Sequence, residues 1–149
     1  MLTTKRPKRN SVEVQYAVAR RGVPRATALR AWAGDVSGIT LRIVGEREAR
    51  RLNATFRKKN KATNVLSFAY GGGRGDVVLC HPVIAREARA QGKTLAAHYA
   101  HLVVHGILHL RGYDHEKKRD ALRMERREVR LLRRLGFPDP YAVKSPPPR

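Results

Sequence analysis

Apolar residues recur along the chain with two different periods, and these periods distinguish predicted strands from predicted helices. Alternation with a period of two predicts one strand over residues 12–18 and a second over residues 39–44. Short apolar runs predict two more strands, over residues 64–70 and 76–80. Because only the glycine-rich stretch 71–75 separates these last two strands, we expect them to form an antiparallel hairpin.

Helical spacing of apolar residues occupies the remaining segments, and proline or glycine marks several of their ends. The expected helices cover approximately residues 24–37, 46–56, 82–88, 94–110 and 116–135. Strands and helices thus alternate in the first half of the chain, and helices alone fill the second half. This order predicts an α+β fold, a single domain with one mixed sheet of about four strands packed with about five helices.

The length and the two ends of the chain define the expected domain organisation. A chain of 149 residues is long enough for one domain with its own hydrophobic core. We expect residues 1–11 to be a basic flexible arm, residues 12–141 the folded domain, and residues 142–149 a proline-rich tail. From Pro138 onward the prolines favour an extended conformation. No internal repeat is visible.

The charge of the chain indicates the chemistry of a partner. The sequence has 32 Lys and Arg against 12 Asp and Glu, a formal net charge of +20. The usual magnitude for a small soluble domain is about 2–8. Such an excess repels itself in the folded state, so a polyanion that relieves the repulsion is the natural partner. We favour a nucleic acid, and an arginine-rich composition without a binding role is the alternative.

Cysteine usage and the absence of long apolar stretches bear on location. Cys80 is the single cysteine, so no intrachain disulfide can form, which suits a reducing compartment. Residues 1–10 lack the apolar core of a secretory signal. The longest apolar stretch, residues 95–110, is interrupted by four histidines and is too polar to span a membrane. We therefore expect a cytoplasmic protein with no membrane partner.

Three histidines have the spacing of a metal site. His105 and His109 are four residues apart on a predicted helix, so both imidazoles project from one face and can reach one ion. Gly112 allows the chain to turn after the helix, and the turn can return His115 to the same point. Three protein ligands leave a fourth position open, as in catalytic zinc sites. We therefore predict one Zn²⁺ per chain, held by His105, His109 and His115.

Two alternatives to a catalytic zinc site are compatible with the same segment. His98 and His101 lie on the same helix face, and we interpret them as packing residues in preference to outer-shell or substrate-facing ones. A metal-free histidine face is disfavoured, because burying several imidazoles together is costly. The spacing also matches the zinc protease motif HExxHxxGxxH, but Gly106 occupies the position of the glutamate base. Without that base, a protease-like hydrolase is the least favoured reading.

The histidine segment and one upstream segment resemble a known family. Residues 105–115 read HGILHLRGYDH and residues 63–68 read TNVLSF. Both resemble the YbeY family of bacterial endoribonucleases, also called rRNA maturation factors. The resemblance runs from about Val12 to Tyr141. Further matching positions are Asn53, Phe56, Arg57, Gly75, Asp76, Met124, Glu125, Leu135, Gly136 and Phe137.

The resemblance implies a mixed sheet packed with helices, and a zinc site on the three histidines. It also implies a single-strand-specific, zinc-dependent endoribonuclease that acts in ribosomal RNA processing, at the 3′ end of small-subunit 16S rRNA, and in ribosome quality control. The implied partners are ribosomal RNA, the small ribosomal subunit, and assembly proteins or GTPases. The alternative is a non-catalytic RNA-binding assembly factor with a structural zinc.

A candidate catalytic residue follows from the charge that develops when a phosphodiester is cleaved. A guanidinium can hold a phosphate through two parallel hydrogen bonds, and Arg57 matches the arginine that the family has near its site. Without that match, a solvated charge is an equally good reading of Arg57. The neighbouring basic residues are candidates for substrate binding, with solvated surface charge as the alternative. They are Lys58, Lys59, Lys61 and Arg74.

Three carboxylates are candidates for supporting the site from behind. Glu125 and Glu128 share a face of the last predicted helix with leucines, and a carboxylate on a buried face needs a partner. We predict that one of them pairs with Arg57 or with the free nitrogen of a zinc-bound histidine. Ordinary salt bridges are the alternative for each. Asp114 is a third candidate.

Two departures from the family pattern leave questions open. Asn64 stands where relatives usually have aspartate, and the loop 71–75 is short and rich in glycine. Neither change touches the predicted metal ligands.

Overall fold

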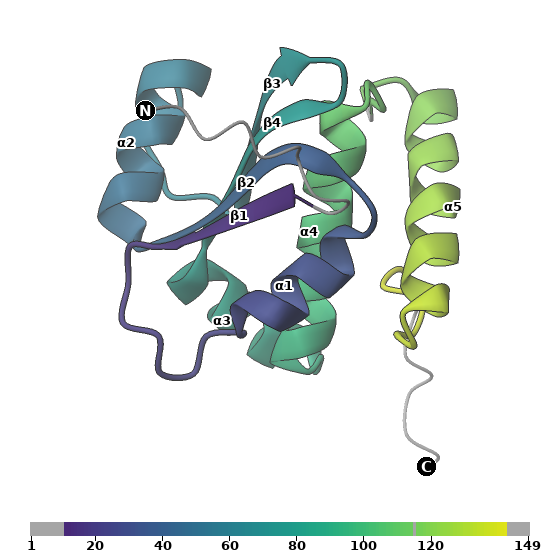
Figure 1. Cartoon of the computed structure of the whole chain (residues 1–149). Coiled ribbons are helices and arrows are strands. Elements are labelled where there is room, and N and C mark those ends of the chain that lie inside the picture. Colours follow the sequence, from purple (N-terminus) through teal and green to yellow (C-terminus); the bar gives the residue numbers. More distant parts are fainter. Residues whose placement is uncertain (1–10, 115, 143–149) are drawn as a thin grey trace, which may run out of the picture.

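The computed structural model describes residues 11–114 and 116–142, and these form one layered α+β domain (Figure 1). The strands are β1 Ser11–Tyr16, β2 Ser37–Val44, β3 Val65–Gly71 and β4 Arg74–Cys80. The helices are α1 Ala26–Ala33, α2 Glu46–Arg57, α3 His81–Gln91, α4 Leu95–Leu110 and α5 Lys118–Arg134. The predicted fold class, one mixed sheet of four strands with five helices, is confirmed. None of the described helices is both long and apolar enough to cross a lipid bilayer.

The sheet has the strand order β1-β2-β4-β3, with β3 at one edge. β1 and β2 run parallel and are joined by the crossover helix α1. β2 also runs parallel to β4, and β3, which follows α2 in the chain, pairs antiparallel with β4. The expected hairpin is therefore confirmed. Its connection is shorter than expected, because β3 continues to Gly71 and β4 begins at Arg74. Gly72 and Gly73 alone make the turn, both with positive φ.

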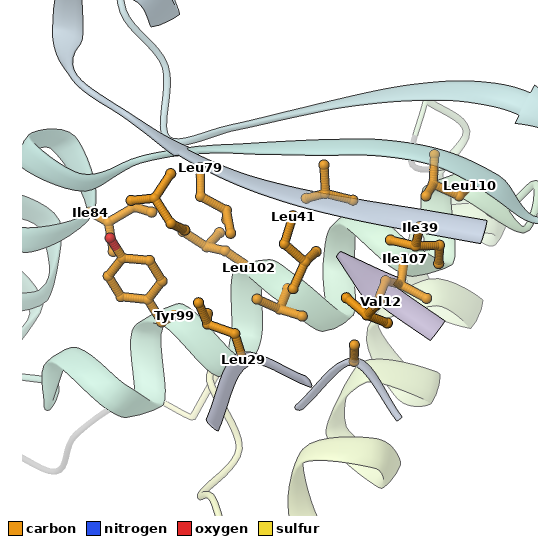
Figure 2. Packing of buried hydrophobic residues seen from close by; sticks show 14 residues of the cluster. Val12, Leu29, Ile39, Leu41, Leu79, Ile84, Tyr99, Leu102, Ile107 and Leu110 are labelled. Atoms are coloured by element: carbon orange, nitrogen blue, oxygen red, sulfur yellow. The ribbon is translucent and has the colours of Figure 1, made fainter. Parts of the chain in front are cut away.

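The larger hydrophobic core lies between the sheet and helices α1 and α4. Ile39 and Leu41 alternate inward from β2, and Leu79 points the same way from β4 (Figure 2). Leu102 and Ile107 of α4 close this core from the opposite side. On the other face of the sheet, α2 covers a smaller core. That second core comprises Val44, Ala49, Leu66, Val78 and Cys80.

Helix α4 is covered on two sides, which fixes its position. One side packs on the sheet, and the opposite side packs on α5, which is the outermost helix in Figure 1. The contact with α5 contains Val104 and Leu108 from α4, and Met124 and Leu132 from α5. Ten of the sixteen residues of α4 are buried. Any side chain between these two contacts is therefore held on a rigid element.

Several helix ends differ slightly from the expected ones. Helix α4 begins where Thr94 caps it, the threonine Oγ1 accepting a hydrogen bond from the backbone N–H of Ala97 at 3.1 Å. Helix α5 begins at Lys118, two residues later than expected. The extended conformation expected from Pro138 is wrong for the last described residues. There the N–H of Tyr141 donates to an Asp139 carboxylate oxygen at 2.8 Å and closes a turn.

Candidate metal centre

Helix α4 presents a line of histidines between its two apolar contacts. His98, His101, His105 and His109 follow one another at intervals of three and four residues, so their rings stack along one side of the helix. The ring centroids of His105 and His109 are 4.6 Å apart. Because leucine and valine fill the other sides of α4, the only histidine-bearing side is the one that opens toward β3 and α5.

The Nε2 atoms of His105 and His109 lie 3.1 Å apart, facing each other. Two nitrogens bound to one tetrahedral zinc at ~2.05 Å are about 3.3 Å apart, so this separation fits a shared ion. Imidazole nitrogen is also a donor that zinc prefers. The predicted pair thus has the donor chemistry and the spacing of a metal centre.

The third predicted ligand, His115, lies outside the described residues. The turn that precedes it is described. The N–H of Gly112 donates to the carbonyl of His109 at 3.0 Å, and the N–H of Tyr113 donates to the carbonyl of Leu108 at 3.1 Å. This is the Schellman arrangement that ends a helix, and it requires the positive φ of 93° at Gly112. The glycine turn expected after the helix is therefore present, while the role of His115 stays a prediction.

Glu128 supports the histidines from α5. Its carboxylate accepts hydrogen bonds from Nε2 of His101 at 2.6 Å, from Nδ1 of His105 at 3.2 Å and from the hydroxyl of Tyr141 at 2.8 Å. The side chain has no exposed surface. Burial alone raises the pKa of Glu128, but the hydrogen bonds from the two histidines prevail and hold it at about 2.

The contact between Glu128 and His105 fixes the tautomer of that histidine. An ionised carboxylate only accepts hydrogen bonds, so Nδ1 of His105 carries the proton and Nε2 presents its lone pair. This is the orientation that a metal ligand needs, and carboxylates behind ligating histidines commonly provide it. Of the two glutamates considered for this support, Glu128 contacts His105, and its role behind a metal ligand stays a prediction. Arg57, the other partner considered for these glutamates, donates instead to the backbone carbonyl of Ser67. Glu125 lies one turn away from Glu128 on α5 and is half-buried.

A second group of donors shares two of these residues. The ligand atoms of His101, His105 and Glu128 lie within 4.8 Å of one another, so this group can also hold a metal ion. An ion there would replace the protons that join Glu128 to both histidines, and the carboxylate is closed to solvent. His105 and His109 instead line an open cleft, which gives an ion an entry path. The pair is the better candidate.

The cleft in front of the histidine pair has a volume of about 520 Å³. Its walls come from the end of α2, strand β3 and the last turn of α4. The residues that line it are Arg57, Asn64, Val65, Leu66, Ser67, Ala69, His105, His109 and Leu110. The structure therefore brings Arg57 to the same cleft as two of the predicted metal ligands, although these residues are about fifty positions apart in the sequence.

Arg57 is held at this cleft by two contacts with β3. Its Nη2 donates to the backbone carbonyl of Ser67 at 2.6 Å, and its guanidinium carbon lies 5.1 Å from the ring centroid of Phe68. Phe68 in turn packs edge-to-face on Phe56, the residue before Arg57. These contacts distinguish Arg57 from an unconstrained surface charge.

Gly106 allows α4 to lie close to the sheet. A Cβ at this position would be 2.6 Å from Cγ1 of Val77 and 3.2 Å from Oγ of Ser67, which donates to the Gly106 carbonyl. A side chain here would therefore point into the sheet, away from the Nε2 atoms of the histidine pair. The position that carries the glutamate base in the protease motif has neither the residue nor the space for it.

The other predicted site residues lie around the cleft without lining it. Lys58, Lys59 and Lys61 are exposed in the loop that follows Arg57, and Lys58 ends α2 in the left-handed conformation. Arg74 begins β4, and its side chain packs over Gly38. Asp114 is exposed, and its carboxylate accepts a hydrogen bond from the N–H of Glu116 at 3.1 Å. None of these five residues is among those that line the cleft.

Asn64 at the edge of the cleft connects it to a second polar network. Its amide donates to a Glu87 carboxylate oxygen at 3.0 Å, and its own carbonyl accepts from the N–H of Val65 at 2.7 Å. The same oxygen of Glu87 lies 2.9 Å from Nε2 of buried His98, whose pKa is lowered by burial. An aspartate at position 64 would face Glu87 with like charge, whereas the amide of Asn64 donates to it.

Two residues of the site were missed by sequence reasoning. His101 was assigned to packing, but it is hydrogen-bonded to Glu128 and lies one turn from His105. Its position on the histidine face was the available signal. Tyr141 contacts both Glu128 and His101, its hydroxyl 3.1 Å from Nε2 of the latter. No local pattern in the proline-rich segment indicated that a tyrosine would fold back onto the site.

The fold and the cleft together define a class: this is a layered α+β protein with a candidate metal centre. The centre has a histidine pair, a supporting glutamate and an arginine at the same cleft. The comparisons with known proteins are more specific. The sequence model of the family described as Endoribonuclease YbeY matches residues 5–136. The chain belongs to the YbeY family. The predicted resemblance is confirmed.

Curated relatives and one solved structure agree with this assignment. The chain is 48% identical to "Endoribonuclease YbeY" of Nitrosomonas eutropha, over 89% of this chain and 99% of the relative. It is 51% identical to the protein of that name from Bordetella pertussis, over 88% and 95%. The solution structure of a Thermotoga maritima protein aligns with a TM-score of 0.52 at 23% identity, over 93% and 99%. That last likeness concerns the fold alone.

Proposed function

We propose that this chain is a single-strand-specific, zinc-dependent endoribonuclease that acts on ribosomal RNA. In this proposal it acts in two processes, the maturation of the 3′ end of small-subunit 16S rRNA and ribosome quality control. The names of the relatives support an endoribonuclease, and the net charge of +20 supports a polyanionic substrate. The observation that carries the proposal is the facing pair of Nε2 atoms, 3.1 Å apart, at a cleft that Arg57 also lines.

The metal ligands in this proposal are His105, His109 and His115. Glu128 has a positioning role, because its carboxylate keeps the proton of His105 on Nδ1 and the lone pair on Nε2. A bound zinc ion would supply Lewis-acid polarisation of a phosphoryl oxygen and would lower the pKa of a coordinated water to ~7. The negative charge of Glu128 also partly balances the charge of a cation bound nearby.

Arg57 is the proposed catalytic residue. A guanidinium carries five N–H donors, and one of those on Arg57 is used by the Ser67 carbonyl. The remaining donors can bind the phosphate oxygens on which negative charge develops during cleavage. The contact with Phe68 limits the motion of the side chain and so orients these donors. Lysine cannot reproduce this arrangement, because its ammonium is a compact charge on a flexible stem.

The remaining site residues have supporting roles in the proposal. Lys58, Lys59, Lys61 and Arg74 are proposed to bind the RNA backbone on either side of the cleft, and their exposure supports this role. Asp114 and Glu125 stay candidates for outer-shell support, with less backing from contacts than Glu128. The proposed partners are the small ribosomal subunit and its assembly proteins or GTPases, in the cytoplasm.

The experiment that tests the proposal combines metal analysis with RNA cleavage. The intact chain is expected to contain about one zinc, which is the number that a three-histidine site holds, and to cleave a single-stranded RNA in a zinc-dependent manner. His109→Ala is expected to lose both the metal and the cleavage while RNA binding persists. Arg57→Lys is expected to keep the metal and to lose about 100-fold or more in kcat.

Two matched controls belong to this experiment. His81→Ala removes a histidine of α3 that hydrogen-bonds Tyr99, and should keep the zinc. Tyr99 lies near the N-terminal end of α4, far along the helix from His109. Arg47→Lys repeats the arginine substitution on an exposed part of α2. Zinc and RNA binding without any cleavage would contradict the proposal and would favour an assembly factor with a structural zinc. Metal-dependent peptide cleavage would favour a protease-like hydrolase.

A further inference from the structure

The face of α5 that turns away from α4 is densely basic. One side of the helix packs on α4 through Met124, Glu128 and Leu132, and in Figure 1 the opposite side has no helix or strand beside it. At ~100° per residue, one line of exposed arginines runs along that opposite side. It consists of Arg119, Arg123, Arg126, Arg130 and Arg133. With a rise of 1.5 Å per residue, this arginine line extends over about 21 Å.

The arginine line has few acidic neighbours on its own helix. The acidic residues of α5 are Asp120, Glu125 and Glu128, and the last of these is buried and bonded to the histidines. In the part of the chain that the structure describes, no arginine of this line lies within 4.0 Å of a carboxylate. Arg126 and Arg130 have no acidic residue three or four positions away on the helix. By contrast, Arg42 on the sheet is paired with Glu48.

Such a line destabilises the isolated protein. Arg126 and Arg130 are four positions apart and Arg130 and Arg133 three apart, so like charges are direct neighbours on the helix surface. Their spacing of about 5 Å along the axis is shorter than the Debye length of ~8 Å at physiological salt, so salt screens the repulsion only in part. A polyanion lying along the line would remove this repulsion and release its own counterions.

Two open grooves follow this face and lead toward the metal centre. The first, about 770 Å³, is lined by Arg119, Arg123, Arg126 and Arg130 together with Leu122 and Tyr113. The second, about 680 Å³, is lined by Arg126, Arg130 and Arg133, by the carboxylates of Glu125 and Asp139, and by Tyr141. The hydroxyl of Tyr141 bonds to Glu128, which in turn bonds to His105. The second groove is thus linked to the metal centre through Tyr141 and Glu128.

We propose that the arginine line of α5 is a second RNA-binding surface, which holds the phosphate backbone of the RNA that flanks the strand in the cleft. This inference rests on the proposed function in taking RNA as the partner. The line adds affinity for RNA long enough to extend from the cleft over α5, and it makes no contact with the nucleotides at the metal centre. Phosphate contacts of this kind position an RNA without reading its sequence.

The test is RNA binding by the triple variant Arg126→Gln, Arg130→Gln, Arg133→Gln as a function of salt. Each lost phosphate contact lowers the slope of log K against log[salt] by about 0.7 for a single strand, so a decrease of about 2 is expected. At 0.1 M salt, this corresponds to affinity weaker on the order of 100-fold for an RNA of about 30 nucleotides. An RNA of about six nucleotides, long enough for the cleft alone, is expected to bind and be cleaved as by the intact chain.

The matched control is Arg47→Gln, Arg50→Gln, Arg51→Gln, which removes the same charge from exposed positions of another helix, α2. Its affinity for the longer RNA should fall no more than about threefold, by the general loss of charge. Equal weakening in the two triple variants, or an unchanged salt slope in the α5 variant, would overturn the proposal. So would a variant that loses binding to poly-glutamate but not to RNA, which would assign the line to an acidic protein. If the intact chain cleaves no RNA, the proposed function fails, whereas this binding comparison still decides the role of α5.

Discussion

The two buried sides of α4 follow opposite rules. Toward the sheet, Leu102, Val103 and Ile107 meet other apolar side chains, and the contact is dry and non-directional. Beside its apolar contact with α5, the histidine face of the same helix meets Glu128 of α5, a charged residue with no exposed surface. Its contact with His101 and His105 depends on hydrogen bonds with defined donors and distances.

This difference shows how one helix serves stability and chemistry at once. The apolar side fixes the position of α4 through surface area, so it tolerates exchange of one apolar residue for another of similar volume. The polar side fixes ring orientations and tautomers, and a buried carboxylate is retained there because it has three donors. Substitutions on the first side should change stability, and those on the second should change the metal centre.

The largest effect is expected from Leu41→Ala. Leu41 is fully buried against α4, and removal of its side chain leaves a cavity in the larger core. We expect a loss of about 2–5 kcal/mol in the free energy of unfolding, measured by urea denaturation, with unchanged zinc content while the protein is folded. Leu122→Ala, at a position that is 45% exposed, is the control and should cost less than about 0.5 kcal/mol. Loss of zinc from the folded Leu41 variant would break the proposed separation of the two sides.

The next effect is expected from Glu128→Gln. The amide cannot accept from both histidines, so His105 loses the partner that keeps its proton on Nδ1. Zinc affinity, measured by competition with a chelator, should fall about 10–100-fold. Glu125→Gln repeats the same substitution one turn away on α5, and the affinity should fall much less, because the hydrogen bonds to His101 and His105 come from Glu128. Equal affinities of the two variants would contradict the positioning role of Glu128.

A smaller effect is expected from Tyr141→Phe. The variant loses the hydroxyl that donates to Glu128 at 2.8 Å and lies 3.1 Å from His101. Because Tyr141 is 42% exposed, water can replace part of this contact, and we expect a loss of about 0.5–1.5 kcal/mol in the free energy of unfolding. The hydroxyl of Tyr113 has no hydrogen bond among the described residues, so Tyr113→Phe should be neutral. Equal stabilities of the two variants would show that the hydroxyl of Tyr141 does not stabilise the histidine face of α4.

The smallest effect is expected from Glu48→Gln. In contrast to buried Glu128, Glu48 is partly exposed, and it pairs with Arg42 of β2 at 2.6 Å. The hydrogen bond from Arg42 lowers the pKa of Glu48 below its ordinary value. As pH falls, Glu48 therefore binds a proton first in the unfolded state. The contribution of the pair to the free energy of unfolding is present above the ordinary pKa of glutamate, and it disappears as pH falls through the pKa of Glu48 in the folded state. Both side chains are partly exposed, so it should be only about 0.2–1 kcal/mol. Acid unfolding of Glu48→Gln should lack this increment, and an identical pH profile would show that the pair contributes nothing.

Most of the fold could be predicted because its signals are local. Period-two alternation identified β1 and β2, and the glycine-rich stretch identified the hairpin of β3 and β4. The strand order could not be predicted in this way, because placing β4 between β2 and β3 depends on how helices pack on both faces. The turn at residues 139–142 was also missed, since Tyr141 is held there by contacts with distant residues.

The residues of the candidate site also differ in how far local sequence predicts them. His105 and His109 could be paired from their spacing, because a helix places residues four apart on one face. Arg57 came from the family pattern and from its charge, and the cleft that it shares with the histidines depends on tertiary structure. Nothing local distinguished Glu128 from Glu125, which lie one turn apart on the same helix. Only the packing of α5 on α4 decides which of them meets the histidines.

The bond between Arg57 and the Ser67 carbonyl has a consequence for self-association. β3 is an edge strand, and Ser67 turns its carbonyl away from β4, where another chain could add a strand. The guanidinium of Arg57 occupies this acceptor and places a positive charge beside it, and a second copy that approached edge to edge would bring the same charge. The arginine that faces the cleft thus also keeps the open edge of the sheet from becoming a template for aggregation.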